Sequence, residues 1–401
     1  MPNIALRVVV IAGLLWSGGY CAAKTLYVDV NGPNDPGTGS YQDPFRRIQE
    51  AIDLSDNNDM VIVAKGRYYE NIRIDTNNIV LTSTDPNAPD VVAKTIVDGN
   101  NTGSVVTFTG VEGPETVLSG FTITNGRANY GGGIYCLNNS RPVITNCTVS
   151  GNTATGYGGG IYCFNNSNSI ITNCIIAGNS ADYGGGIACV LAGPVIGNCA
   201  IINNSASYGG GIVCVASDPI ISNCTITKST VVNDGNSLAC NSSQQQYPSN
   251  VQVINCILWN GGEEIWNNDG STITVSYSNI DGGWTGYGNI DAEPLLEMDG
   301  YHLKIDSPCK GMADPLGDYN DHTDIDGEPR VIGIYVDMGC DEFLMVGDLD
   351  YDEYVNWTDL AIFDLHWLQT ADGQAADFDR DGIVNFADFA DLAENWFYQQ
   401  Q

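Results

Sequence analysis

One short string recurs along the middle of this chain and limits what it can fold into. Gly-Gly-Gly-Ile-Tyr-Cys occupies residues 131–136 and 158–163, and close variants of it occupy 184–189 and 209–214. Half a period later, each copy is followed by an apolar run that ends in Asn-Cys. The spacing of 25 to 27 residues is too short for repeats built from pairs of helices, and the runs are too rich in β-branched residues.

Each repeat contains two or three short apolar runs separated by Gly or Asn. These two residue types accept the left-handed backbone conformation of tight turns. A unit of this size cannot bury its apolar side alone, so successive units must stack, with each strand beside a parallel partner in the next coil. The repeat therefore predicts a parallel β-helix.

Stacking places equivalent residues of successive repeats beside one another, so that ten of the thirteen cysteines form ladders. We interpret these cysteines as small buried side chains, because no histidine accompanies them and one thiol per coil does not make a four-ligand metal site. Neighbouring thiols are close enough in principle for disulfides, and stacked asparagine amides can hydrogen-bond from coil to coil. The two cysteine ladders and the asparagine ladder are Cys136, Cys163, Cys189, Cys214 and Cys240; Cys147, Cys174, Cys199, Cys224 and Cys256; and Asn146, Asn173, Asn198, Asn223 and Asn255.

The segments that flank the repeats carry a resemblance to a known superfamily. Residues 25–53 and 60–74 resemble the entry region of the pectin-lyase-like right-handed parallel β-helix proteins, in which a short helix, here at 45–54, covers the open end of the stack. Residues 307–315, 324–330 and 336–343 resemble the closing segment of secreted β-helix proteins described as choice-of-anchor Q, where Cys309 and Cys340 could pair. The resemblance implies that residues 24–343 form an all-β right-handed parallel β-helix, a solenoid with a cap and a closing segment.

Two loops near the C-terminus, at 348–359 and 377–388, repeat one pattern of oxygen-bearing side chains with an offset of 29 residues. Oxygen ligands at positions 1, 3, 5, 9 and 12, with a backbone carbonyl at position 7, can enclose a Ca²⁺ ion. An apolar helical face follows each loop. The predicted ligands are Asp348, Asp350, Asp352, Tyr354, Asn356 and Asp359 in the first loop, and Asp377, Asp379, Asp381, Ile383, Asn385 and Asp388 in the second.

This tandem pattern resembles a type I dockerin, because aspartate closes each loop and no helix precedes it. The resemblance implies a small α-helical calcium-binding domain at 346–398 that holds two calcium ions and binds a cohesin-like scaffold protein. Gly382 occupies the turn position of the second loop, whereas Glu353 occupies it in the first, so we expect the second site to bind calcium more tightly. Trp357-Thr358 and Phe386-Ala387 stand where cellulosomal dockerins commonly carry small hydroxyl residues.

Charge and the N-terminal segment indicate where the protein works. The chain has 48 acidic against 15 basic residues and a formal net charge of −33, which disfavours nucleic acid and anionic membranes as partners. Arg7 precedes the apolar run 8–16, and small residues follow, as in a cleaved signal peptide over residues 1–23. We therefore expect a secreted protein, extracellular or at the cell surface, and not an integral membrane protein.

The resemblance implies a role in the breakdown of extracellular polysaccharide, by a lyase or a glycoside hydrolase, but the residues identify no catalytic set. The three histidines, His302, His322 and His366, all follow the repeats, and Asp182 and Asp218 are expected in loops. The alternative is a non-catalytic glycan-binding or surface-display protein. The polar candidates outside the repeat pattern are Arg127, Arg141, Lys228, Glu263 and Glu264, and a tyrosine ladder, which is either a sugar-binding platform or a structural stack, is formed by Tyr130, Tyr157, Tyr183 and Tyr208.

Overall fold

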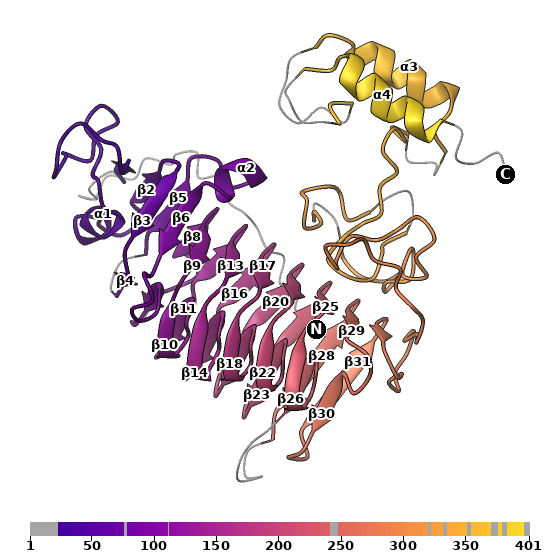
Figure 1. Cartoon of the computed structure of the whole chain (residues 1–401), viewed down its shortest axis with the longest axis horizontal. Helices are drawn as coiled ribbons and strands as arrows, with labels where there is room; N and C mark the ends of the chain where they lie inside the picture. The colour runs from indigo at the N-terminus through magenta and orange to yellow at the C-terminus, as the bar shows by residue number, and fades with distance from the viewer. Residues whose placement is uncertain are drawn as a thin grey trace, which may run out of the picture.

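The computed structural model describes residues 23–75, 78–110, 112–240, 248–319, 322–331, 335–350, 354–369, 376–378 and 383–396. Within these ranges the chain forms a stack of coils whose strands lie in parallel sheets along one axis (Figure 1). The repeat therefore predicts the fold class correctly. No helix in the described ranges has the length and apolar character needed to cross a bilayer.

Three long parallel sheets form the walls of the solenoid. The ten-strand sheet contains β1 (Thr25–Val28), β2 (Met60–Val63), β5 (Val80–Ser83), β8 (Val117–Ser119), β12 (Val143–Thr145), β16 (Ile170–Thr172), β20 (Val195–Gly197), β24 (Ile220–Ser222), β28 (Asn250–Ile254) and β31 (Thr272–Ser276). The nine-strand sheet contains β3 (Gly66–Tyr69), β6 (Thr95–Asp98), β9 (Thr122–Thr124), β13 (Thr148–Ser150), β17 (Ile175–Ala177), β21 (Ala200–Ile202), β25 (Thr225–Thr227), β29 (Ile257–Trp259) and β32 (Asn279–Ile280). The eight-strand sheet contains β4 (Ile72–Ile74), β7 (Val106–Phe108), β11 (Ile134–Leu137), β15 (Ile161–Phe164), β19 (Ile187–Val190), β23 (Ile212–Val215), β27 (Leu238–Cys240) and β30 (Ile265–Asn267).

A fourth, shorter sheet lies in the turn that leads into each glycine triplet. Its residues carry no strong apolar pattern, and these strands are therefore not predicted from the sequence. One consequence is that Asp182, expected in a loop, lies instead in a strand with its side chain exposed. Backbone pairing between identical turns of successive coils is enough to form such strands. The five-strand sheet contains β10 (Arg127–Tyr130), β14 (Thr153–Tyr157), β18 (Ser180–Tyr183), β22 (Ser205–Tyr208) and β26 (Thr230–Asp234).

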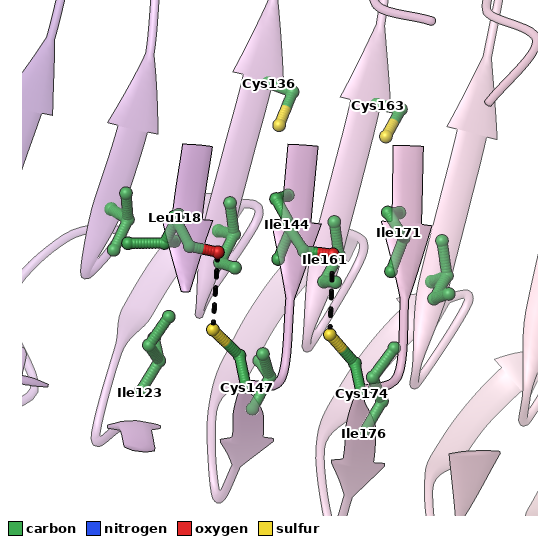
Figure 2. Close-up of a cluster of buried hydrophobic side chains, with 14 of the residues drawn as sticks. Leu118, Ile123, Cys136, Ile144, Cys147, Ile161, Cys163, Ile171, Cys174 and Ile176 are labelled. Atoms are coloured by element: carbon green, nitrogen blue, oxygen red, sulfur yellow. Dashed lines mark hydrogen bonds between the residues drawn. The ribbon is translucent and has the colours of Figure 1, made fainter. Parts of the chain in front are cut away.

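The cysteine ladders lie inside the coils, as predicted. Cys136 pairs in register with Cys163, and the same register continues through Cys189, Cys214 and Cys240. In the second ladder, each thiol approaches a carbonyl oxygen of the preceding coil, as Cys147 Sγ does with Leu118 O at 3.7 Å (Figure 2). All twelve cysteines in the described ranges are buried and carry free thiols, Cys309 and Cys340 included.

The predicted asparagine ladder occupies the turn between the ten-strand and nine-strand sheets. Its five members have φ angles between 50° and 56°, the left-handed conformation expected of them. Successive amides bond between coils, as when Asn198 Nδ2 donates to Asn173 Oδ1 at 2.8 Å. A second ladder, not predicted, is fully internal: Asn152, Asn179 and Asn204 are each at most 1% exposed.

A short helix covers the entry to the stack. α1 (Ile48–Asp53) buries Ile48, Ala51 and Ile52 against the first coil, which confirms the cap predicted at 45–54. α2 (Pro89–Val92) lies between two strands of the next coils. Capping removes the first coil's apolar interior from water, as the resemblance implied.

Two helices form the C-terminal module, α3 (Trp357–His366) and α4 (Phe386–Asn395). Its small core includes Val355, Phe363, Val384 and Leu392. Each helix begins with the same capping box, built on Asn356 in one and on the equivalent asparagine, Asn385, in the other. The two loop–helix units are thus equivalent in structure as well as in sequence.

Candidate functional site

The first predicted calcium loop brings its carboxylates together. One oxygen from each of Asp348, Asp350 and Asp359 lies within 4.8 Å of the others. Asp359 is fully buried, and its carboxylate accepts hydrogen bonds from the backbone N–H groups of Leu349 at 2.6 Å and Asn356 at 2.8 Å. Carboxylates held this close together repel one another unless a cation lies between them. All the candidate ligand atoms are oxygens, which Ca²⁺ prefers, so the described part of this loop fits Ca²⁺.

The second loop closes in the same way. Asp388, also fully buried, accepts hydrogen bonds from the backbone N–H groups of Phe378 at 2.7 Å and Asn385 at 2.8 Å. Asp388 thereby joins the two described ends of the second loop, at 376–378 and 383–388. The predicted ligands Asp352, Asp379 and Asp381 lie outside the described residues, as do Glu353 and Gly382, so the expected difference in affinity stays a prediction.

The tyrosine ladder forms a continuous stack on the outer face of the eight-strand sheet. Tyr183 is sandwiched between Tyr157, with ring centroids 4.8 Å apart, and Tyr208, at 5.5 Å. Beneath these rings lie Tyr162, Ala188, Val213 and Ala239, all buried. Within the ladder, each ring stacks face to face with the next, and both faces of the middle rings are therefore already in contact. The middle of the ladder thus covers the sheet, as expected of a structural stack.

The first ring of the ladder is different. Tyr130 belongs to β10, the first strand of the five-strand sheet, so no tyrosine of the ladder precedes it, and it is 46% exposed. It borders a hollow of about 610 Å³, lined also by Arg127, Asn129, Tyr135 and Ser104 among others. Arg127 is exposed, and none of the ion pairs found among the described residues involves it. Aromatic surface, a cation and amides thus meet at one end of the ladder.

Two of the other polar candidates, Glu264 and Lys228, have structural partners for their side chains. Glu264 is buried in the coil interior, where burial raises its pKa, although Ser237 Oγ and Asn260 Nδ2 both donate hydrogen bonds to it. Lys228 Nζ donates to Met298 O of the closing segment, and the Arg141 backbone N–H donates to Glu112 O. Among the five candidates, Arg127 is the one that the structure places in a hollow.

A cluster in the closing segment, not predicted from the sequence, surrounds His302. Burial alone would lower the pKa of His302, but its hydrogen bonds with Asp326 and Asp299 outweigh burial and raise the pKa to about 10. Burial also raises the pKa of nearby Asp341 to about 8. The acids lie far from His302 in sequence, except Asp299, so only the fold brings them together.

The coil stack and the two loop–helix units define a β-helix protein with a small α-helical module at its C-terminal end. Residues 90–245 match the family described as the right handed beta helix region, and residues 346–395 match the dockerin type I domain. The chain therefore combines a right-handed parallel β-helix with a C-terminal type I dockerin domain. No curated protein matches the chain significantly.

Solved structures with low sequence identity to this chain include two enzymes that act on pectin or pectate. The pectate lyase Pel9A has 13% sequence identity and a TM-score of 0.50, and the match covers 81% of this chain and 98% of that one. The pectin methylesterase PemA from Erwinia chrysanthemi has 11% identity and a TM-score of 0.39, with 68% and 94% of the two chains covered. At 13% identity, the similarity to Pel9A supports the β-helix architecture, with no implication for activity.

Proposed function

We propose that this protein is an extracellular component of a polysaccharide-degrading assembly, in which the dockerin module attaches it to a cohesin-like scaffold and the β-helix binds polysaccharide. The dockerin match supports the attachment, because dockerins are docking modules. The proposal includes a signal peptide at 1–23, a β-helix at 24–343 and a module at 346–398. It also includes two calcium ions held by the ligand set predicted from the two loops.

The observation that carries the proposed binding activity is the hollow beside Tyr130. A sugar ring stacks well on a flat aromatic face, and Tyr130 is the most exposed ring of the ladder. Arg127 can form a paired hydrogen bond with a uronate carboxylate, and Asn129 and Ser104 can bond to hydroxyl groups. The ligand class that fits best is therefore a polysaccharide containing acidic sugars.

Binding is better supported than catalysis at this hollow. A glycoside hydrolase needs two carboxylates at a defined separation, and a lyase needs a base beside the cation. The residues that line the hollow include one charged side chain, that of Arg127, and no carboxylate. Cleavage by a lyase or hydrolase therefore remains a prediction that the lining of this hollow does not support.

Binding can be measured by retention of the full-length protein on a panel of acidic and neutral polysaccharides. We expect Tyr130→Ala to weaken binding by about fivefold, the loss of roughly 1 kcal/mol of ring contact. Arg127→Gln should weaken binding to acidic polysaccharides and leave neutral ones unaffected. Tyr183→Ala is the matched control, since its ring faces are already covered by Tyr157 and Tyr208.

Equal losses in Tyr130→Ala and Tyr183→Ala would contradict the assignment of the site, and no retention by the wild type on any polysaccharide would contradict the function. The same panel should be assayed for unsaturated products and new reducing ends. Turnover by the wild type would establish the enzymatic alternative.

A further inference from the structure

Three loops of the closing segment bring one imidazole and three carboxylates together on the outer side of the nine-strand sheet. The four side chains are those of Asp299, His302, Asp326 and Asp341. Each loop is anchored by a neighbour of one of these residues: Tyr301, Ile325 and Cys340 pack with Ala200 and Ile202 of β21. The positions of the cluster residues therefore follow from packing against the rigid coil stack.

Asp299 fixes the orientation of the imidazole. Its carboxylate lies 2.5 Å from His302 Nδ1 and also accepts a hydrogen bond from the backbone N–H of Tyr301 at 3.1 Å. With Nδ1 engaged, Nε2 points at Asp326 Oδ2, 2.7 Å away, and lies 4.0 Å from Asp341 Oδ1. One ligand atom from each of His302, Asp326 and Asp341 thus lies within 4.8 Å of the others.

Asp341 is the one buried residue among the three that share this geometry. The residue is only 5% exposed, and the backbone N–H of Leu303 donates a hydrogen bond to its Oδ2 at 2.7 Å. Its other oxygen, Oδ1, lies 4.0 Å from His302 Nε2, so that Asp326 and Asp341 both approach the same imidazole nitrogen. A carboxylate buried to this extent is costly unless a cation lies beside it, which here is either the protonated imidazole or a metal ion.

We propose that His302, Asp326 and Asp341 form a binding site for a divalent transition metal, with Zn²⁺ as the best-fitting ion, and that Asp299 acts as the positioning residue. One imidazole with two carboxylates is a donor set for zinc rather than for calcium, which prefers oxygen ligands alone. In zinc sites, the histidine ring nitrogen that does not bind the metal usually donates a hydrogen bond to a carboxylate or a carbonyl, as His302 Nδ1 can do to Asp299.

The distances fit this ion. Zinc–ligand bonds of 2.0–2.1 Å in a tetrahedron place the ligand atoms roughly 3.3 Å apart. The two separations measured from His302 Nε2, 2.7 Å and 4.0 Å, lie on either side of that value. Side-chain movements of under about 1 Å would bring three ligands to an ion, whose fourth position a water molecule can take.

The metal would join three loops that contain no helix and no named strand, and would thereby hold the closing segment against the stack. Because the three ligands converge only in the folded chain, metal binding adds stability to the folded state. The competing occupant is a proton on His302, which would make the cluster an internal ion pair. A proton and a metal compete for the same atom, Nε2.

The test uses the full-length protein in saturating Ca²⁺, so that the C-terminal loops are filled. Zn²⁺ is titrated calorimetrically, and Co²⁺ is used as a visible-absorption probe of imidazole ligation. We expect one equivalent of Zn²⁺ to bind, a tetrahedral Co²⁺ spectrum, and a higher melting temperature for the β-helix. His302→Gln and Asp341→Asn should lose all three effects, and Asp299→Asn should weaken binding about tenfold.

His322→Gln is the matched control, because this histidine also lies in the closing segment but outside the cluster. Thermal melting of each variant without zinc shows whether the variant is folded. If His302→Gln does not fold, Asp299→Asn provides a milder change to the same cluster. If the wild type binds no zinc, or binds it no better than His302→Gln does, the cluster is an internal ion pair and the proposal is wrong.

Discussion

Each ladder cysteine occupies the interior of a coil, where a small apolar side chain fits. Nine of the ten are 0% exposed, and Cys147 is 2% exposed. Burial raises the pKa of Cys136 and of Cys256 well above the ordinary value for a thiol. These two thiols are therefore not ionised near neutral pH, and it is the thiolate that reacts. Burial keeps reagents from the remaining ladder thiols.

We therefore expect the ladder cysteines to be inert in the folded protein. A thiol reagent should label none of them without denaturant and all of them after unfolding, as read by intact-protein mass spectrometry. Rapid labelling of several of Cys136, Cys163, Cys189 and Cys214 in native protein would contradict their inward orientation.

The internal asparagines have stricter hydrogen-bonding requirements than the cysteines, because their side-chain amides bond to neighbouring coils. Asn179 Nδ2 donates to Val149 O at 2.9 Å and to Asn204 Oδ1 at 3.1 Å, and its Oδ1 accepts from the backbone N–H of Asn152 at 3.0 Å. Removing this side chain leaves a buried donor and a buried acceptor without partners.

Asn179→Ala should lower the free energy of unfolding by about 3 kcal/mol, the upper part of the range for unsatisfied buried groups. Denaturant unfolding measures the loss. Asn129→Ala, at an exposed position in β10, is the control and should change stability by less than about 0.5 kcal/mol. Similar values for the two variants would show that the internal ladder contributes little.

Among the structural elements, the glycine triplet marks a place where neighbouring coils approach too closely for a side chain. A Cβ atom on Gly159 would lie 2.5 Å from the carbonyl oxygens of both Gly185 and Ser180. These are backbone atoms and cannot move aside without displacing the next coil. Gly178, in contrast, has φ of 63°, and no other residue comes within 4 Å of the position that a Cβ atom would take there.

Gly159→Ala should therefore destabilise the stack by about 3 kcal/mol or prevent its folding. Gly178→Asn is the matched control, because asparagine accepts a left-handed backbone and the site has room. Circular dichroism during thermal unfolding compares the two. Equal melting temperatures would mean that the triplet is not needed for close packing.

The sequence was sufficient to predict those elements that the repeat period determines. The ladders of Cys136 and Asn146 follow directly from residues that recur once per coil, and the calcium loops from ligand spacing. The five-strand sheet is not predictable in this way, because its strands have no apolar alternation. The internal asparagine ladder is predictable, because Asn152, Asn179 and Asn204 recur at the repeat spacing and appear when the repeats are aligned. The cluster of His302 could not be found, since three non-repeating loops meet there only after folding.

The whole molecule consists of two units that differ in what stabilises them. The β-helix is held by ladders and an apolar interior that include none of the predicted calcium ligands. The dockerin module has a small core and ten predicted side-chain ligands. Eight of these predicted ligands are aspartates, whose mutual repulsion a bound cation would relieve. Polysaccharide binding would thus persist where calcium is scarce, and attachment to a scaffold would not.

Hydrogen exchange of the full-length, zinc-free protein, with calcium and with a calcium chelator, tests this difference between the two units. We predict that removing calcium abolishes protection in peptides from 346–398, while peptides from the repeats at 128–260 keep their protection unchanged. Protection of the C-terminal peptides that survives the chelator, or loss of protection in the coils, would show that calcium does not stabilise the two units separately.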